Sequence, residues 1–352
     1  PHMLPTTWSW SRSASKHGRM IRNFLYSILL TLVVCSCGVD GKHFKLEGRL
    51  LHLNQGEFYV YSTDGLLNGI DTVKIVGGRF AYEIPCTEQG TLVIVFPNFY
   101  EQPVFAAPGK SVKVTGDASL LRELETEGTR DNELMTAFRK QVSGLSPQQT
   151  IAAAAAFAQK NADSEAALWI VRKYFVATPS PDYAQARKLL ATLHDRQPRN
   201  GNVARLAQQV NALAATVSGA KLPKFSCTDT SGNTVSSAEI TKAAVGVIYL
   251  WASWNYESTE MQRRLKQMKD KAGNKLCVIG FSVDAAQASC SSFLERDSVK
   301  WSTVCDGLMF ESKTVRTLGL YSIPSNILLK NGKIIERNIS SQELMRKLEE
   351  LL

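Results

Sequence analysis

Short runs of alternating apolar and polar residues fill the chain from position 44 to about 116, with turn residues between them. A period of two places the apolar side chains on one face of a β-strand. Residues 72–75 and 79–84 flank Gly77-Gly78, a pair that is typical of a hairpin turn. The pattern predicts an all-β domain, an antiparallel β-sandwich, over residues 44–127.

The pattern changes to helical spacing over residues 128–219, which are rich in Ala, Gln, Leu and Lys. Ser146-Pro147 and Ser180-Pro181 each place a capping residue before a proline at the first helical position. Helices are predicted near 131–143, 147–160, 164–176, 181–194 and 201–217. The sequence leaves open whether this α-helical middle segment is a spacer or a surface for a partner.

The last part of the chain, residues 222–352, alternates strand-like and helix-like patterns. Continuous apolar runs at 245–250 and 276–283 predict buried strands, and each is followed by a helical pattern. A turn of the x-N-G-x type at 330–333 precedes one more strand and a closing helix. The order predicts an α/β domain.

The first of these buried strands ends in Trp251-Ala252-Ser253-Trp254 and runs directly into a predicted helix. Unpaired backbone N–H groups and the positive end of the helix dipole meet at such a position, which favours reactive groups. The stretch resembles the active site of the TlpA/ResA-like thioredoxin family of envelope proteins, where the frame is W-A-S-W-C-x-x-C. The resemblance covers about 222–352 and implies a thioredoxin-like fold.

The two cysteines of that frame are replaced, the first by Asn255 and the second by Ser258. Thiol–disulfide exchange needs a thiolate, and neither an amide nor an unactivated hydroxyl can supply one. Asn is a good N-cap residue, so the local architecture can persist. The acidic residue that the family often has three positions further on is also absent, because Met261 stands there beside Glu260. We therefore expect a degenerate site with no catalytic residue at these positions.

The resemblance also implies a binding surface. Ile323-Pro324 matches the cis-proline that faces the cysteine pair in thioredoxin-like proteins, where the preceding residue can pair with an extended substrate. Trp254, Tyr256, Ile323 and Pro324 would then form an apolar patch that could bind an extended peptide or an envelope protein.

Two further features point to the cell envelope. The series G-R-L, I-D-T-V, G-G-R-F and A-P-G-K-S-V-K-V-T-G-D is similar to a domain of unknown function that precedes many envelope TlpA-like domains. Residues 1–37 read as an extension plus a signal peptide, with an apolar run at 24–34. Its end resembles a lipobox, which implies lipidation of Cys37. Cys35 in that role and an ordinary cleaved signal remain alternatives. A lipid anchor would hold the protein on a membrane surface, facing the periplasm or at the outer membrane.

Composition and charge add few constraints. The 352 residues carry a net charge of +9, and the densest basic set lies on the helix after Asn255, which is typical of a solvated face. No nucleic-acid motif accompanies this charge. The seven cysteines form no C-x-x-C and have no metal-ligand spacing, so no metal or cofactor is expected.

The sequence is compatible with two functions. The first is a lipid-anchored envelope protein whose thioredoxin-like domain lacks the redox cysteines and binds a peptide or protein, or has a structural role. The alternative is a thiol–disulfide oxidoreductase or peroxiredoxin-like reductase that uses non-standard cysteines, such as Cys290 with Cys305. A serine hydrolase is disfavoured, because no histidine lies within 222–352.

Overall fold

The computed structural model describes residues 39–352, which form two compact units divided between Ser146 and Pro147. The predicted signal segment, with Cys35 and Cys37, lies outside the described residues. Within residues 39–352, no helix combines the length and the apolar character that a membrane crossing requires.

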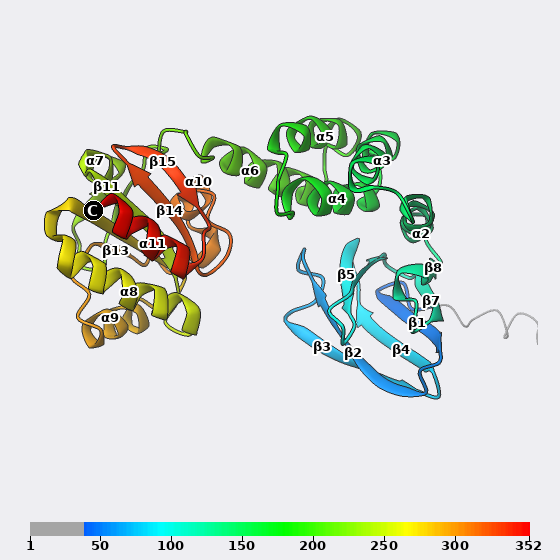
Figure 1. Cartoon of the computed structure of the whole chain (residues 1–352). Coiled ribbons are helices and arrows are strands. Elements are labelled where there is room, and N and C mark those ends of the chain that lie inside the picture. The colour runs from blue at the N-terminus through cyan, green and yellow to red at the C-terminus, as the bar shows by residue number, and fades with distance from the viewer. Residues whose placement is uncertain (1–38) are drawn as a thin grey trace, which may run out of the picture. The chain divides into compact units, whose positions relative to one another are not determined.

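The first unit is built on one eight-stranded sheet (Figure 1). Its strands are β1 (His43–Leu51), β2 (Gln55–Ser62), β3 (Ile70–Val76), β4 (Arg79–Pro85), β5 (Gly90–Val95), β6 (Glu101–Ala106), β7 (Ser111–Asp117) and β8 (Glu125–Glu127). The strand order is β6-β5-β2-β3-β4-β1-β7-β8, and only the β1–β7 pair among these neighbours is parallel.

The all-β prediction is confirmed, but the strands form one sheet in place of the two sheets of a sandwich. The sheet curls into a nearly closed barrel. The long strand β1 explains the difference, because it pairs with β4 on one side and with β7 on the other. These pairings join strands that a sandwich would divide between two layers.

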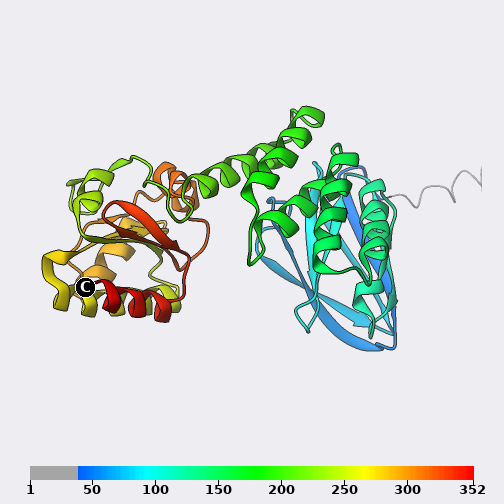
Figure 2. The same ribbon diagram turned by 45° about the horizontal axis from the view of Figure 1, so that its top comes forward.

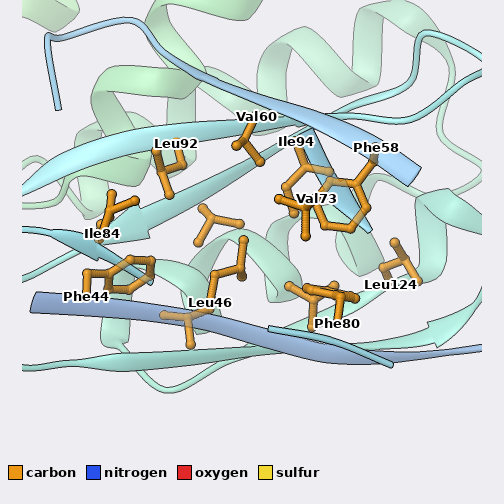
Figure 3. Packing of buried hydrophobic residues seen from close by; sticks show 14 of the residues in the cluster. Phe44, Leu46, Phe58, Val60, Val73, Phe80, Ile84, Leu92, Ile94 and Leu124 are labelled. Carbon is orange, nitrogen blue, oxygen red and sulfur yellow. The ribbon is translucent and has the colours of Figure 1, made fainter. Parts of the chain in front are cut away.

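The core of the barrel is filled by the inward side chains of these strands, as Figure 3 shows. Phe58 and Phe80 meet edge to face with their ring centroids 4.9 Å apart. Gly48 on β1 is packed closely against β7 and the ring of Phe80. A Cβ there would be 2.2 Å from the carbonyl oxygen of Val114, so only glycine fits without movement of the backbone.

Helix α2 (Arg130–Val142) closes the first unit. The buried amide of Asn132 accepts from the backbone N–H of Phe105 at 3.0 Å and donates to its carbonyl oxygen at 2.8 Å. The helix therefore satisfies backbone groups of β6 at the end of the sheet order.

The second unit begins with the remaining helices of the middle segment. They are α3 (Pro147–Lys160), α4 (Glu165–Val171) with a π-helical extension (Arg172–Val176), α5 (Tyr183–Arg196) and α6 (Gly201–Ala215). Together with α2 they confirm the α-helical middle of the chain.

A five-stranded mixed sheet forms the centre of the C-terminal domain. The strands of the domain are β9 (Ser226–Thr228), β10 (Thr234–Ser236), β11 (Val245–Trp251), β12 (Leu276–Ser282), β13 (Thr303–Val304), β14 (Ser325–Lys330) and β15 (Lys333–Arg337). The helices are α7 (Ser237–Lys242), α8 (Tyr256–Ala272), α9 (Gln287–Arg296), α10 (Lys313–Thr317) and α11 (Ser341–Leu351). The order β13-β12-β11-β14-β15, with the first three strands parallel, confirms the thioredoxin-like fold.

The central strand β11 is buried along its whole length, which explains why its sequence is apolar without alternation. Val247, Tyr249 and Trp251 face the core under α8, α9 and α11, whereas Ile248 and Leu250 face the core on the other side of the sheet. Figure 2 shows the sheet between its covering helices. Both faces are therefore closed, and the loop after β11 is positioned by a rigid strand.

Candidate functional site

The candidate site is the loop of residues 252–255, which joins the end of β11 to the start of α8. Asn255 is the N-cap of α8, and its side-chain oxygen accepts from the N–H of Ser258 at 2.8 Å. This bond satisfies one of the donors that a helix start leaves unpaired. The side chain that stands in the place of the first family cysteine therefore has a structural role.

Ser258, in the second cysteine position, is fully buried. Its hydroxyl shares one proton between the carbonyl oxygens of Asn255 at 3.0 Å and Ala252 at 3.2 Å, and accepts from the N–H of Ala252. The hydroxyl thus ties the loop to the first turn of α8. It has no access to solvent and no histidine base in the domain, so it is unsuited to nucleophilic attack.

A residue that the sequence reading missed, Asp284, anchors the same loop from the end of β12. Its carboxylate is 2% exposed and accepts from the N–H of Ser253 at 3.1 Å and from its hydroxyl at 2.8 Å. It also accepts from the hydroxyl of Ser282 at 2.7 Å. The sequence feature that could have identified Asp284 is its position just after a buried parallel strand, next to the strand that carries the site.

The exposed face of the loop is aromatic. Trp254 is 63% exposed and Tyr256 is 75% exposed, although both are large apolar side chains. The Ile323–Pro324 peptide bond is cis, as the resemblance implied. Ser325, the residue after this proline, pairs with Leu250 near the end of β11, so the proline segment lies beside the loop.

Glu260 of α8, an acidic residue close to the loop, is engaged in an ion pair. Glu260 pairs with Arg263 at 2.5 Å, and Arg263 also contacts Asp297 at 3.1 Å.

A groove of about 840 Å³ lies at the other end of the domain and includes Lys266 and Lys269 in its lining. Lys266 pairs with Asp270, and Lys269 donates to the carbonyl oxygens of Gly273 and Leu276, so these two basic side chains already have partners.

The cysteines of the described chain differ in their surroundings. Burial raises the pKa of Cys86, Cys227 and Cys277, the last to about 11. Cys290 and Cys305, by contrast, belong to one buried core, and the Cys290 thiol lowers the pKa of Cys305 to about 7 against the opposing effect of burial. Within residues 39–352, no cluster of three or more His, Cys, Asp or Glu residues could hold a metal ion.

The sheet order, the strand-to-helix loop and the cis-proline together define the class: a thioredoxin-like domain. Residues 218–337 match the AhpC/TSA family, and residues 44–135 match a domain of unknown function, DUF4369. The chain thus carries an AhpC/TSA-type thioredoxin-like domain behind an N-terminal DUF4369 domain.

Solved structures also resemble the C-terminal domain. A thiol-disulfide oxidoreductase from Bacteroides fragilis is 30% identical, with a TM-score of 0.35, over 38% of this chain and 99% of its own. The C-terminal domain of a protein described as a thiol-disulfide oxidoreductase from Bacteroides thetaiotaomicron is 29% identical, with a TM-score of 0.35, over 39% of this chain and 97% of its own. A comparison with curated proteins found no significant match.

Proposed function

We propose that the thioredoxin-like domain binds an extended segment of polypeptide and does not exchange disulfides at the loop of residues 252–255. One observation carries the proposal. The two positions that would bear the cysteines hold a capping amide and a buried hydroxyl, while Trp254 and Tyr256 beside them are exposed. The site has kept a contact surface and has no thiolate with which to react.

The backbone beside the loop supports this function. The N–H and C=O of Ile323 have no hydrogen-bond partner within residues 39–352. An extended peptide could satisfy both groups by adding a short β-type pairing at this point. Its side chains would then meet the rings of Trp254 and Tyr256, and aromatic residues of these two types often dominate binding energy.

The test uses a permanently unfolded probe, reduced and carboxymethylated α-lactalbumin, whose cysteines are blocked. We expect the full chain to bind it, and Trp254→Ala with Tyr256→Ala to raise the dissociation constant by about tenfold or more. Phe99→Ala is the matched control, because Phe99 is 86% exposed but lies in the first unit. Absent binding by the unaltered chain, or equal loss in the control, would contradict the proposal.

Enzymatic thiol–disulfide exchange is the second candidate. It is favoured by the position of Cys290 and Cys305 in one core and by the pKa of Cys305, which the Cys290 thiol lowers to about 7. Both residues are buried, which closes them to a protein substrate. Reduction of insulin separates the candidates. We expect no turnover above background, whereas turnover that disappears in Cys290→Ala or Cys305→Ala would establish the enzyme.

We also propose that the protein is anchored in the cell envelope by a lipid on Cys37, which places the domain outside the cytoplasm. The support is the lipobox-like end of the signal segment. A Cys37→Ser variant should move from the membrane fraction to the soluble fraction, and Cys35→Ser should stay on the membrane. The reverse result would assign the lipid to Cys35.

A further inference from the structure

The exposed large apolar side chains of the thioredoxin-like domain come from two loops. Within residues 222–352 they are Trp254, Tyr256, Leu308 and Met309. The first two lie at the junction of β11 and α8, and the other two follow β13. The peptide-binding proposal uses the aromatic pair alone, so it leaves Leu308, which is 57% exposed, and Met309 unexplained.

The topology of the sheet brings both loops to one edge. Strands β11, β12 and β13 are parallel and end in register, as Trp251 and Ser282 do at the ends of β11 and β12. β14 runs in the opposite direction and begins beside the end of β11. The loops after the first three strands and the segment before β14 therefore lie side by side, in the strand order β13-β12-β11-β14. We call them the four-loop edge, which comprises residues 252–257, 283–287, 305–309 and 319–324.

Direct contacts join neighbouring loops of this edge. The hydroxyl of Ser253 donates to Asp284 at 2.8 Å, which joins the loop after β11 to the loop after β12. A Cβ on Gly307 would lie 3.2 Å from the carbonyl oxygen of Ala285, so the loop after β13 packs against the same segment. Ala285 and Ala286 are themselves exposed. Apolar side chains therefore continue across the middle of the edge.

The backbone around Leu308 is fixed by local hydrogen bonds. The N–H of Leu308 donates to the carboxylate of Asp306 at 3.0 Å, and its carbonyl oxygen accepts from the N–H of Glu311 at 2.8 Å. Met309 has a φ of 54°, in the left-handed region that favours glycine or asparagine. The local fold therefore does not explain a long apolar side chain at this position, whereas a contact surface does.

The charge of the four-loop edge is acidic. Its exposed charged residues are Glu257 and Asp306, although the whole chain carries a net charge of +9. Two acidic surfaces repel each other, which disfavours a second copy of this edge as the partner. A basic ligand is attracted instead.

We propose that the four-loop edge is one binding surface, whose ligand is an extended segment of another protein that combines apolar side chains with at least one lysine or arginine. This ligand class rests on the peptide-binding function proposed above. The backbone of Ile323 pairs with the segment, and Trp254 and Tyr256 contact its side chains beside that point. Leu308 and Met309 contact them at the far end of the edge. Four neighbouring strands span about 14 Å, the length of about four extended residues.

The experiment measures the binding of short blocked peptides to the full chain by isothermal titration calorimetry. Three peptides of about eight residues share a central run of Leu, Phe and Val, and differ in two flanking residues, which are Lys, Gln or Glu. At low salt we expect the Lys peptide to bind about fivefold more tightly than the Glu peptide, or better, and high salt to reduce the difference. Equal affinities for the three peptides would overturn the basic ligand.

Leu308→Ala with Met309→Ala tests the part of the surface that the peptide-binding function does not require. We expect the dissociation constant of the Lys peptide to rise about fivefold or more, and the melting temperature to stay unchanged because both side chains are exposed. Ile70→Ala with Val76→Ala is the matched control, since these residues are 74% and 69% exposed on β3 of the first unit. The control should bind like the unaltered chain.

The outcomes separate this ligand surface from the peptide-binding function. Binding that Trp254→Ala with Tyr256→Ala removes, but Leu308→Ala with Met309→Ala leaves unchanged, would overturn the four-loop edge alone. Absent binding of every peptide would overturn both. A dimer of the unaltered chain that Leu308→Ala with Met309→Ala dissociates would assign the surface to a second copy and overturn the proposed ligand.

A second pair of variants tests the charge. Glu257→Gln with Asp306→Asn removes both acidic groups, and the Asn side chain can still accept from the N–H of Leu308. We expect this variant to lose most of the preference for the Lys peptide over the Glu peptide. An unchanged preference would overturn the role of these two carboxylates.

Discussion

At the scale of single residues, Tyr249 joins the sheet to two other elements. Its phenol is fully buried, donates to the side-chain oxygen of Gln262 at 2.6 Å and accepts from the indole N–H of Trp301 at 3.2 Å. Removing one member of a buried hydrogen-bond network of this kind leaves its partners unsatisfied, which is costly. The hydroxyl therefore links β11 to α8 and to the segment before β13.

Removal of this hydroxyl should destabilise the C-terminal domain. Tyr249→Phe leaves the buried side-chain oxygen of Gln262 without its donor and removes the acceptor of the part-buried indole N–H of Trp301. We therefore expect a loss of about 1–3 kcal/mol in the free energy of unfolding. Tyr321→Phe is the control, because that half-buried phenol makes one long bond of 3.3 Å to a carbonyl oxygen. Urea unfolding measures both variants, and equal losses would show that the network is not responsible.

The same residue predicts a dependence on alkaline pH. Burial raises the pKa of Tyr249 well above its usual value near 10, and the hydrogen bond from Trp301 only partly opposes this. The folded state thus holds a proton that the unfolded state releases, so this contribution is complete below about pH 10 and is lost as pH rises further. Between about pH 10 and 11, stability should fall less steeply in Tyr249→Phe than in the unaltered protein. Identical slopes would contradict the prediction.

At the scale of elements, the start of α8 depends on one side chain. Asn255→Ala removes the acceptor for the N–H of Ser258, and we expect a loss of about 1 kcal/mol in the free energy of unfolding. Asn255→Asp keeps an acceptor at the cap and adds a charge that the helix dipole favours, so its stability should match or exceed that of the unaltered protein. Urea unfolding of the two variants tests the assignment. A loss of similar size in both would argue against the cap.

Much of this element could be predicted from local sequence. The apolar run at 245–250, the break after Trp251 and the capping asparagine are all close together in the chain, so they indicate strand, loop and helix directly. Asp284 was missed because its partner Ser253 lies 31 positions away, and only the parallel pairing of β11 with β12 brings them together. The single sheet of the first unit was missed for a similar reason, since the β1–β7 register is a long-range property.

At the scale of the whole molecule, each compact unit has a core of its own. The barrel core is formed by the strands of the first unit, and the two cores of the thioredoxin-like domain lie within the second. Compact units with separate cores can unfold in separate transitions. We therefore expect a mutation in one core to leave the transition of the other unit in place.

Gly48→Ala tests this independence from the barrel side. Its Cβ would lie 2.2 Å from the carbonyl oxygen of Val114 and 2.4 Å from the ring of Phe80, so β1 and β7 must separate, at a cost of about 1–3 kcal/mol. Gly56→Ala is the matched control, because its Cβ would meet its nearest neighbour, in Leu53, at an ordinary 3.5 Å. In calorimetry of the full chain, Gly48→Ala should lower one transition and Tyr249→Phe the other, and the double variant should lower both by the same amounts. A single transition that both variants lower would mean that the two units unfold as one cooperative body, because only shared unfolding lets a clash in the barrel weaken the thioredoxin-like core.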